Sequence, residues 1–103
     1  MSEVLVLAGA EAHLFALYDK LEAWREGLGD RFDADFQNAC STLSKYPRIG
    51  PPFEGRFRRL LMVKWQVGLF YAIDGNRVVV HAVLDLRQSP NAIRRQLGLN
   101  PDL

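Results

Sequence analysis

The sequence predicts a single α+β domain. In this fold an antiparallel meander sheet, joined by an N-terminal strand, packs one face against a two-helix hairpin, and a short C-terminal helix follows. Three observations predict it. The length of 103 residues allows one hydrophobic core, so we expect one domain over 1–103. Apolar residues recur at helical spacing in the first half of the chain. Strand-forming residues and turn signals dominate the second half.

The chain is expected to begin with a strand at 3–8 and to continue into a helix. The run "EVLVLA" is apolar and is bounded by a glycine, which indicates a strand buried on both faces. A helix is then predicted from Ala10 to about Glu26, because apolar side chains recur at three- and four-residue steps. His13 lies outside this stripe and is expected to be solvated. The stripe, which places a tryptophan in the core, consists of Leu14, Leu17, Tyr18, Leu21 and Trp24.

A second helix is predicted after the glycine-rich break "GLGD" at 27–30, with Asp30 as its N-terminal cap. It should end at Tyr46, since Pro47 disfavours helical geometry in the residue before it. Two helices joined by so short a loop form an antiparallel hairpin. Cys40 is the only cysteine, so no intrachain disulfide forms, and its helical position indicates a core residue. The inward stripe consists of Phe32, Phe36, Ala39, Cys40 and Leu43.

The residue pattern in the second half of the chain predicts a surface loop, three strands and a short helix. The loop "PRIGPPFEG" (47–55) is too rich in proline and glycine for a helix or a central strand. Strong turn residues, above all "DGN", separate the strands that follow, which are expected at 57–63, 67–73 and 77–85.

The position of the last strand is predicted by its apolar run. A strand with one wet face would alternate, so 77–85 should be central, between the rest of the meander and the N-terminal strand. A short helix at 89–98, capped by Ser89, ends the fold. Both helices of the hairpin are expected on one face, which leaves the opposite face open as a binding surface.

Composition excludes several classes of function. A net charge of +1 does not fit a dedicated nucleic-acid-binding domain, so any contact with a polyanion must be local. The first residues do not resemble a secretory signal, and no apolar run approaches the roughly 18 residues that span a bilayer. We therefore expect a cytoplasmic protein with no membrane contact, no metal site and no cofactor.

Three segments carry a resemblance to a known family. They are "YPRIG" (46–50), "FRRLLM" (57–62) and "GLFYAIDGNRVVVHAVLDLR" (68–87). In this order, over roughly residues 3–90, the chain resembles the RelE/ParE superfamily of toxins from bacterial type II toxin–antitoxin, or plasmid stabilisation, systems. The resemblance implies a toxin that is neutralised by a cognate antitoxin. RelE-like members are ribosome-dependent mRNA endonucleases, whereas ParE-like members act on DNA gyrase.

If the chain is a nuclease, its catalytic candidates are Arg59, Arg87 and His81. Attack by a 2′-OH needs a base for the proton and cations for the phosphorane charge. The resemblance favours Arg59 and Arg87. Each candidate also has a structural interpretation. His81, expected on one face with Val79 and Val83, can be a half-buried structural residue. Arg59 can tie strand to loop, and Arg87 can be solvated.

The carboxylate of Asp85 has two interpretations as well. It can orient the imidazole of His81, or it can cap the turn before the last helix.

The residues favour the ParE-like branch, in which binding replaces catalysis. The resemblance implies that a RelE-like enzyme would carry a cluster of lysines on the second helix and a tyrosine near the C-terminus. Here the second helix carries few basic residues, and no Phe, Trp or Tyr follows Tyr71. The expected partners are a cognate antitoxin and a target, either DNA gyrase or, for the nuclease branch, the ribosome with mRNA. A homodimer, a toxin–antitoxin heterotetramer and an inactive family member that only binds a partner stay open. The partner-binding candidates are Arg58, Lys64, Trp65 and Arg77.

Overall fold

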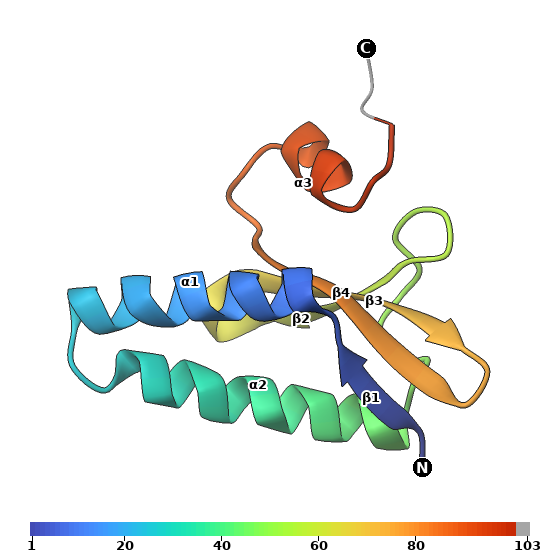
Figure 1. The fold of residues 1–103 in the computed structure, drawn as a ribbon, viewed down its shortest axis with the longest axis horizontal. Helices are drawn as coiled ribbons and strands as arrows, with labels where there is room; N and C mark the ends of the chain where they lie inside the picture. Colours follow the sequence, from blue (N-terminus) through green and yellow to red (C-terminus); the bar gives the residue numbers. More distant parts are fainter. Residues whose placement is uncertain (101–103) are drawn as a thin grey trace.

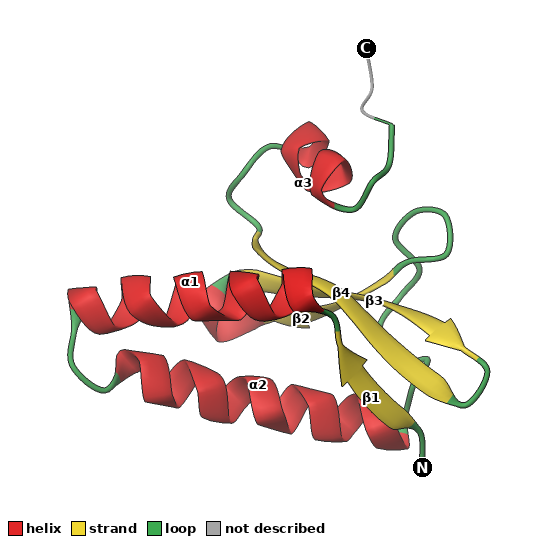
Figure 2. Cartoon of the chain, in the orientation of Figure 1, coloured by secondary structure: helices red, strands yellow, loops and turns green. Residues whose placement is uncertain are grey.

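The computed structural model describes residues 1–100 as a four-stranded sheet with two long helices on one face and a short helix on the other (Figures 1 and 2). The last three residues of the predicted domain, 101–103, lie outside the described part. None of the helices within residues 1–100 has the length and apolar character needed to cross a membrane. In chain order the elements are β1 Glu3–Val6, α1 Ala8–Trp24, α2 Leu28–Lys45, β2 Arg58–Met62, the 3-10 turn η1 Val63–Trp65, β3 Val67–Asp74, β4 Arg77–Asp85 and α3 Pro90–Gln96.

The sheet confirms the predicted order of strands. Its order is β1-β4-β3-β2, so β4 is central and has β1 as one of its neighbours. The meander of β2, β3 and β4 is antiparallel, whereas β1 pairs with β4 in parallel. The sheet as a whole is therefore mixed. The parallel pair is possible because the connection from β1 to β4 is long and contains both helices.

The helical hairpin is confirmed, but two of its details differ from prediction. Asp30 does not cap α2, because Gly27 takes a left-handed conformation (φ 89°) that starts the helix at Leu28. Asp30 instead accepts a hydrogen bond from the Tyr18 hydroxyl, at 2.6 Å. Trp24 was expected in the core and is 81% exposed. It is the last residue of α1, and this end of the helix extends beyond the sheet (Figure 1).

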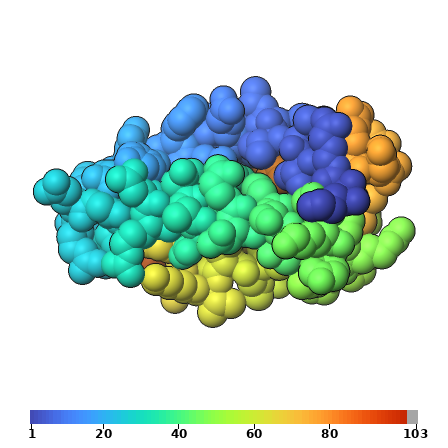
Figure 3. All heavy atoms as spheres, turned by 90° about the horizontal axis from the view of Figure 1, so that it is seen from below, coloured from blue at the N-terminus to red at the C-terminus, as the bar shows by residue number. Residues whose placement is uncertain are grey.

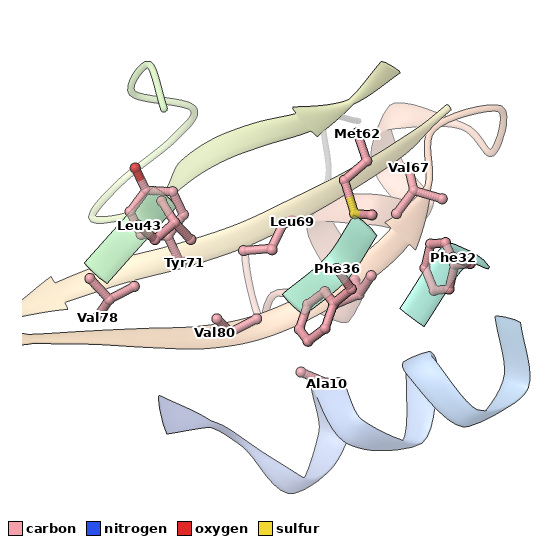
Figure 4. Close-up of a cluster of buried hydrophobic side chains, with 11 residues drawn as sticks. Ala10, Phe32, Phe36, Leu43, Met62, Val67, Leu69, Tyr71, Val78 and Val80 are labelled. Atoms are coloured by element: carbon pink, nitrogen blue, oxygen red, sulfur yellow. The ribbon is translucent and has the colours of Figure 1, made fainter. Parts of the chain in front are cut away.

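The main core lies between the hairpin and the sheet. Figure 3 shows α1 (blue) and α2 (teal to green) side by side over much of this face of the molecule. Figure 4 shows the buried side chains meeting from both layers, with Phe32 and Phe36 of α2 directed at the strands. Tyr71, Phe32 and Leu69 are at most 1% exposed. Burial of large apolar side chains at about 1.5–3 kcal/mol each makes this cluster the principal source of stability.

The opposite face of the sheet is not open, which corrects the prediction. Phe70 and Ala82 are fully buried there, and Leu84 is nearly so. They are covered by Ile93 of α3 and by Phe53 of the 47–57 loop. The 89–98 helix was expected only to close the fold, and the loop was expected only on the surface, because neither carries enough apolar residues to indicate that together they shield this face.

A β-bulge in the β3–β4 ladder changes the faces of β4. The register passes from Phe70↔Ala82 to Tyr71↔Val80, which leaves His81 as the extra residue. Val83 consequently packs in the main core, while the imidazole of His81 meets the Phe57 ring edge-on at 5.1 Å. The prediction that His81 and Val83 share a face was therefore wrong. It assumed an alternation that the bulge interrupts.

His13 also differs from its expected solvated position. Its Nδ1 accepts a hydrogen bond from the Val83 amide, at 3.3 Å. β1 pairs with β4 only as far as Val80, so beyond that point β4 has no strand on this side. The His13 imidazole on α1 therefore accepts the hydrogen bond from the Val83 amide that the carbonyl of a neighbouring strand would otherwise have accepted. Partial burial lowers the pKa of His13 below its ordinary value.

Candidate functional site

A cleft rich in cations lies where the two helices turn, beside the end of the sheet. It has a volume of about 490 Å³ and is formed by the end of α1, the start of α2, η1 and the segment after β4. We call it the cationic cleft. Its lining residues are Leu21, Trp24, Arg25, Leu28, Arg31, Lys64, Trp65, Gln66 and Arg87.

Two left-handed residues bring these segments together. Gly27 makes the tight turn that places the start of α2 against the end of α1. Gln66 has a φ of 53° and ends η1. Its carbonyl accepts the Leu86 amide at 2.9 Å, which fixes η1 beside the segment that leaves β4. The predicted candidates Lys64, Trp65 and Arg87 thereby line one cleft.

Trp65 is a fixed wall of the cleft. Its indole Nε1 donates to Asp35 Oδ2 at 2.8 Å, and its ring meets the edge of Phe32 at 5.4 Å. The Lys64 ammonium lies 5.4 Å from the Trp65 ring centroid, in a cation–π arrangement. The side chain therefore packs on α2.

Arg87 is held at the rim by Asp85. Its guanidinium makes a two-point contact, Nε to Oδ1 at 3.0 Å and Nη2 to Oδ2 at 2.7 Å. The hydrogen bonds from Arg87 lower the pKa of Asp85 to about 2. The carboxylate also accepts the Arg87 backbone amide, so Asp85 closes the turn after β4 and does not orient the His81 imidazole. Arg87 itself is 66% exposed.

The remaining cations of the cleft are unpaired within the described part of the chain. Arg25, Arg31 and Lys64 are exposed, and among residues 1–100 none of them lies within 4.0 Å of a carboxylate. Only one of the four lining cations is thus neutralised. The local charge is strongly positive although the whole chain is close to neutral.

The other predicted site residues lie elsewhere. Arg58 donates to the carbonyls of Gly50 and Arg48, at 2.8 and 3.2 Å, and ties β2 to the preceding loop. Arg77 pairs weakly with Asp74, at 3.5 Å, across the exposed hairpin turn. These contacts give both arginines structural partners, and neither arginine lines the cationic cleft.

The two nuclease candidates on the meander contact the 47–57 loop. Arg59 lies over the Phe53 ring at 5.5 Å. His81 meets Phe57, and burial, with a smaller contribution from Arg56, lowers the pKa of its imidazole. Arg87 lines the cationic cleft instead. The three catalytic candidates are therefore divided between two surroundings.

Sequence reasoning missed half of the cleft. Trp24 was expected in the core, and neither Arg25 nor Arg31 was predicted as a site residue. The available signal was the position of these side chains on both sides of the "GLG" break, since residues that flank a tight helical turn become neighbours.

The cleft has the chemistry of an anion site. Guanidinium and ammonium groups bind carboxylates and phosphates, and exposed indole rings add apolar contact area. Within residues 1–100 no group of three or more His, Cys, Asp or Glu side chains is placed to hold a metal ion.

Fold and cleft together define a class: a small α+β protein with a helical hairpin on a mixed sheet and a basic, aromatic surface site. Residues 4–90 match the family described as ParE toxin of type II toxin-antitoxin system, parDE. This chain belongs to that family of toxins. A solved structure described as a chromosomal ParDE toxin–antitoxin system from P. aeruginosa has a similar fold, with a TM-score of 0.65 and 16% identity over 84% of this chain and 98% of the other. A search of curated protein sequences finds no match.

Proposed function

We propose that this protein inhibits bacterial growth by binding a cellular protein target such as DNA gyrase, and that a cognate antitoxin neutralises it. Membership of the ParE toxin family supports the toxin role. The similar solved structure is described as a ParDE toxin–antitoxin system, which supports an antitoxin partner for this chain as well. The site of action is the cytoplasm, where such a target is found.

The division of the nuclease candidates carries the choice of binding over catalysis. A base and the cations that stabilise a phosphorane must surround one reacting phosphate. Arg59 and His81 contact phenylalanines of the loop, while Arg87 lines the cationic cleft and is bound to Asp85. Recognition needs no such convergence. It needs exposed groups with complementary chemistry, which the cleft supplies.

The four candidate partner contacts differ in how directly each can touch a partner. They are Arg58, Lys64, Trp65 and Arg77. Lys64 and Trp65 line the cleft and are the main candidates. Arg58 holds the loop in place, so its substitution acts on a binding surface only through that loop. Arg77 lies at the exposed β3–β4 turn and provides a separate peripheral charge.

Two activity assays on the purified protein test the proposal. We expect inhibition of DNA supercoiling by gyrase, relieved by the candidate antitoxin, and no cleavage of mRNA in a translating extract. Cleavage that is lost in Arg59→Ala and Arg87→Ala would overturn the proposal in favour of a RelE-like endonuclease.

Expression without antitoxin provides the second test. Growth should stop in cells that produce the wild type and continue when a cognate antitoxin is produced with it. As a control, a toxic member of the family is produced at the same level of folded protein. If that control stops growth and this protein does not, this protein is an inactive family member that only binds a partner. Size measurement of the complex then separates a homodimer from a toxin–antitoxin heterotetramer.

A further inference from the structure

The cationic cleft differs in charge from the neighbouring surface of the hairpin. The outer groove between α1 and α2 is lined by Glu11, Asp19 and Asp33, together with the 64% exposed Phe15. The hydrogen bond to Asp30, with the nearby negative charges of Glu22 and Asp33, raises the pKa of Tyr18 to about 12. The two hollows of the helical hairpin are thus lined by charges of opposite sign, positive in the cationic cleft and negative in the outer groove.

We propose that the cationic cleft binds a short acidic peptide segment of a protein partner, with carboxylates on Arg25, Arg31 and Lys64 and an apolar side chain against Trp24. This inference rests on the proposed function, since it names the chemistry that a partner must present. Three exposed cations without carboxylate partners in residues 1–100 leave charge to be complemented. Trp24, 81% exposed, leaves apolar area to be covered.

Single-stranded nucleic acid fits the same surface less well. Its binding proteins offer several aromatic platforms along a positive track. Here Trp65 is engaged by Phe32, Asp35 and Lys64, so only Trp24 is free to stack on a base. A strand that leaves the cleft along the hairpin would also meet the acidic groove, which repels phosphates. A short segment with two or three carboxylates meets neither obstacle.

Tryptophan fluorescence provides the measurement, because Trp24 and Trp65 are the only tryptophans and both line the cleft. The probe is a short synthetic peptide of alternating glutamate and leucine. Its matched control has every glutamate replaced by glutamine. We expect saturable binding of the acidic peptide, weakened by salt, and at least about tenfold weaker binding of the amide control. The Trp24→Phe variant should lose most of the spectral change.

Charge reversal localises the binding. Arg31→Glu and Lys64→Glu change exposed side chains and should each weaken the acidic peptide about tenfold. Arg95→Glu, an exposed change on α3 outside the cleft, should leave the affinity unaltered. Unchanged thermal melting of the variants confirms that the fold is kept.

Three outcomes would overturn the inference. They are equal binding of the acidic and amide peptides, equal weakening by Arg95→Glu, and tighter binding of a single-stranded oligothymidine of matched charge. The last result would identify a nucleic-acid site. Because peptide binding is measured without gyrase or growth, its failure is distinguishable from failure of the proposed function. A toxic protein that ignores the peptide would refute only this inference.

Discussion

The substitution Tyr71→Phe removes a single buried hydroxyl group and should lower the free energy of unfolding by about 2–4 kcal/mol. Tyr71 is fully buried in the main core, and its hydroxyl joins β3 to the loop before β2. The hydroxyl accepts the Gly50 amide at 3.0 Å and donates to the Pro47 carbonyl at 2.7 Å. Phenylalanine keeps the ring and deletes both bonds.

The two bonds differ in cost. Gly50 is buried, so its amide is left without a partner, at about 1–3 kcal/mol. The Pro47 carbonyl belongs to a partly exposed residue that water can reach, and its bond contributes about 1 kcal/mol. The expected loss is therefore about 2–4 kcal/mol. For a domain of this size that corresponds to a fall in Tm of roughly 10–20 °C.

Urea unfolding followed by tryptophan fluorescence measures the loss, with an unchanged m value as evidence that the unfolded surface is the same. Tyr46→Phe is the matched control, since Tyr46 is 63% exposed and should change stability by less than about 0.5 kcal/mol. A Tyr71→Phe variant as stable as this control would refute the view that the hydroxyl fixes the loop.

Two further predictions concern titratable groups. The pKa values of His13 and His81 are lowered by burial, so the unfolded chain binds protons that the folded chain does not. Stability should therefore decrease as pH falls below about 6.5, and unfolding curves at about pH 7 and about pH 5 should converge in a His13→Gln/His81→Phe variant. Burial, helped by Asp33, raises the pKa of Cys40 to about 11, so iodoacetamide should modify it slowly in the native protein and rapidly in urea. Rapid native modification would contradict the half-buried position.

The order of elements could be predicted because periodicity and turn residues are local properties of a sequence. The central place of β4 followed from its continuous apolar run, and the end of α2 from Pro47. The bulge could not be predicted. Val78, Val80 and Val83 are all apolar, so a one-residue insertion between them leaves no trace in the hydrophobic pattern. Its effect is nevertheless large, since it reverses the faces of β4 beyond His81.

The candidate site could be predicted only in part for a related reason. Lys64, Trp65 and Arg87 stood out because they interrupt or end apolar strands. Arg25 and Arg31 are separated from them by more than thirty positions in sequence, and no local pattern marks them as site residues. Their meeting depends on the left-handed Gly27 turn and on the Gln66 to Leu86 bond, both of which are set by tertiary packing.

Burial of both faces of the sheet determines where a partner can bind. Along β3, Tyr71 packs under the helices and Phe70 packs under α3 and the loop, and neither is exposed to any extent. The apolar stretch from Phe57 to Arg87 therefore cannot present its middle to another molecule without unfolding a core. Its basic residues near either end remain accessible, and Lys64 and Arg87 both line the cationic cleft. A partner of the folded protein must accordingly recognise the edges and ends of the sheet or the helices, and the cationic cleft is where unpaired charge and exposed indole area coincide.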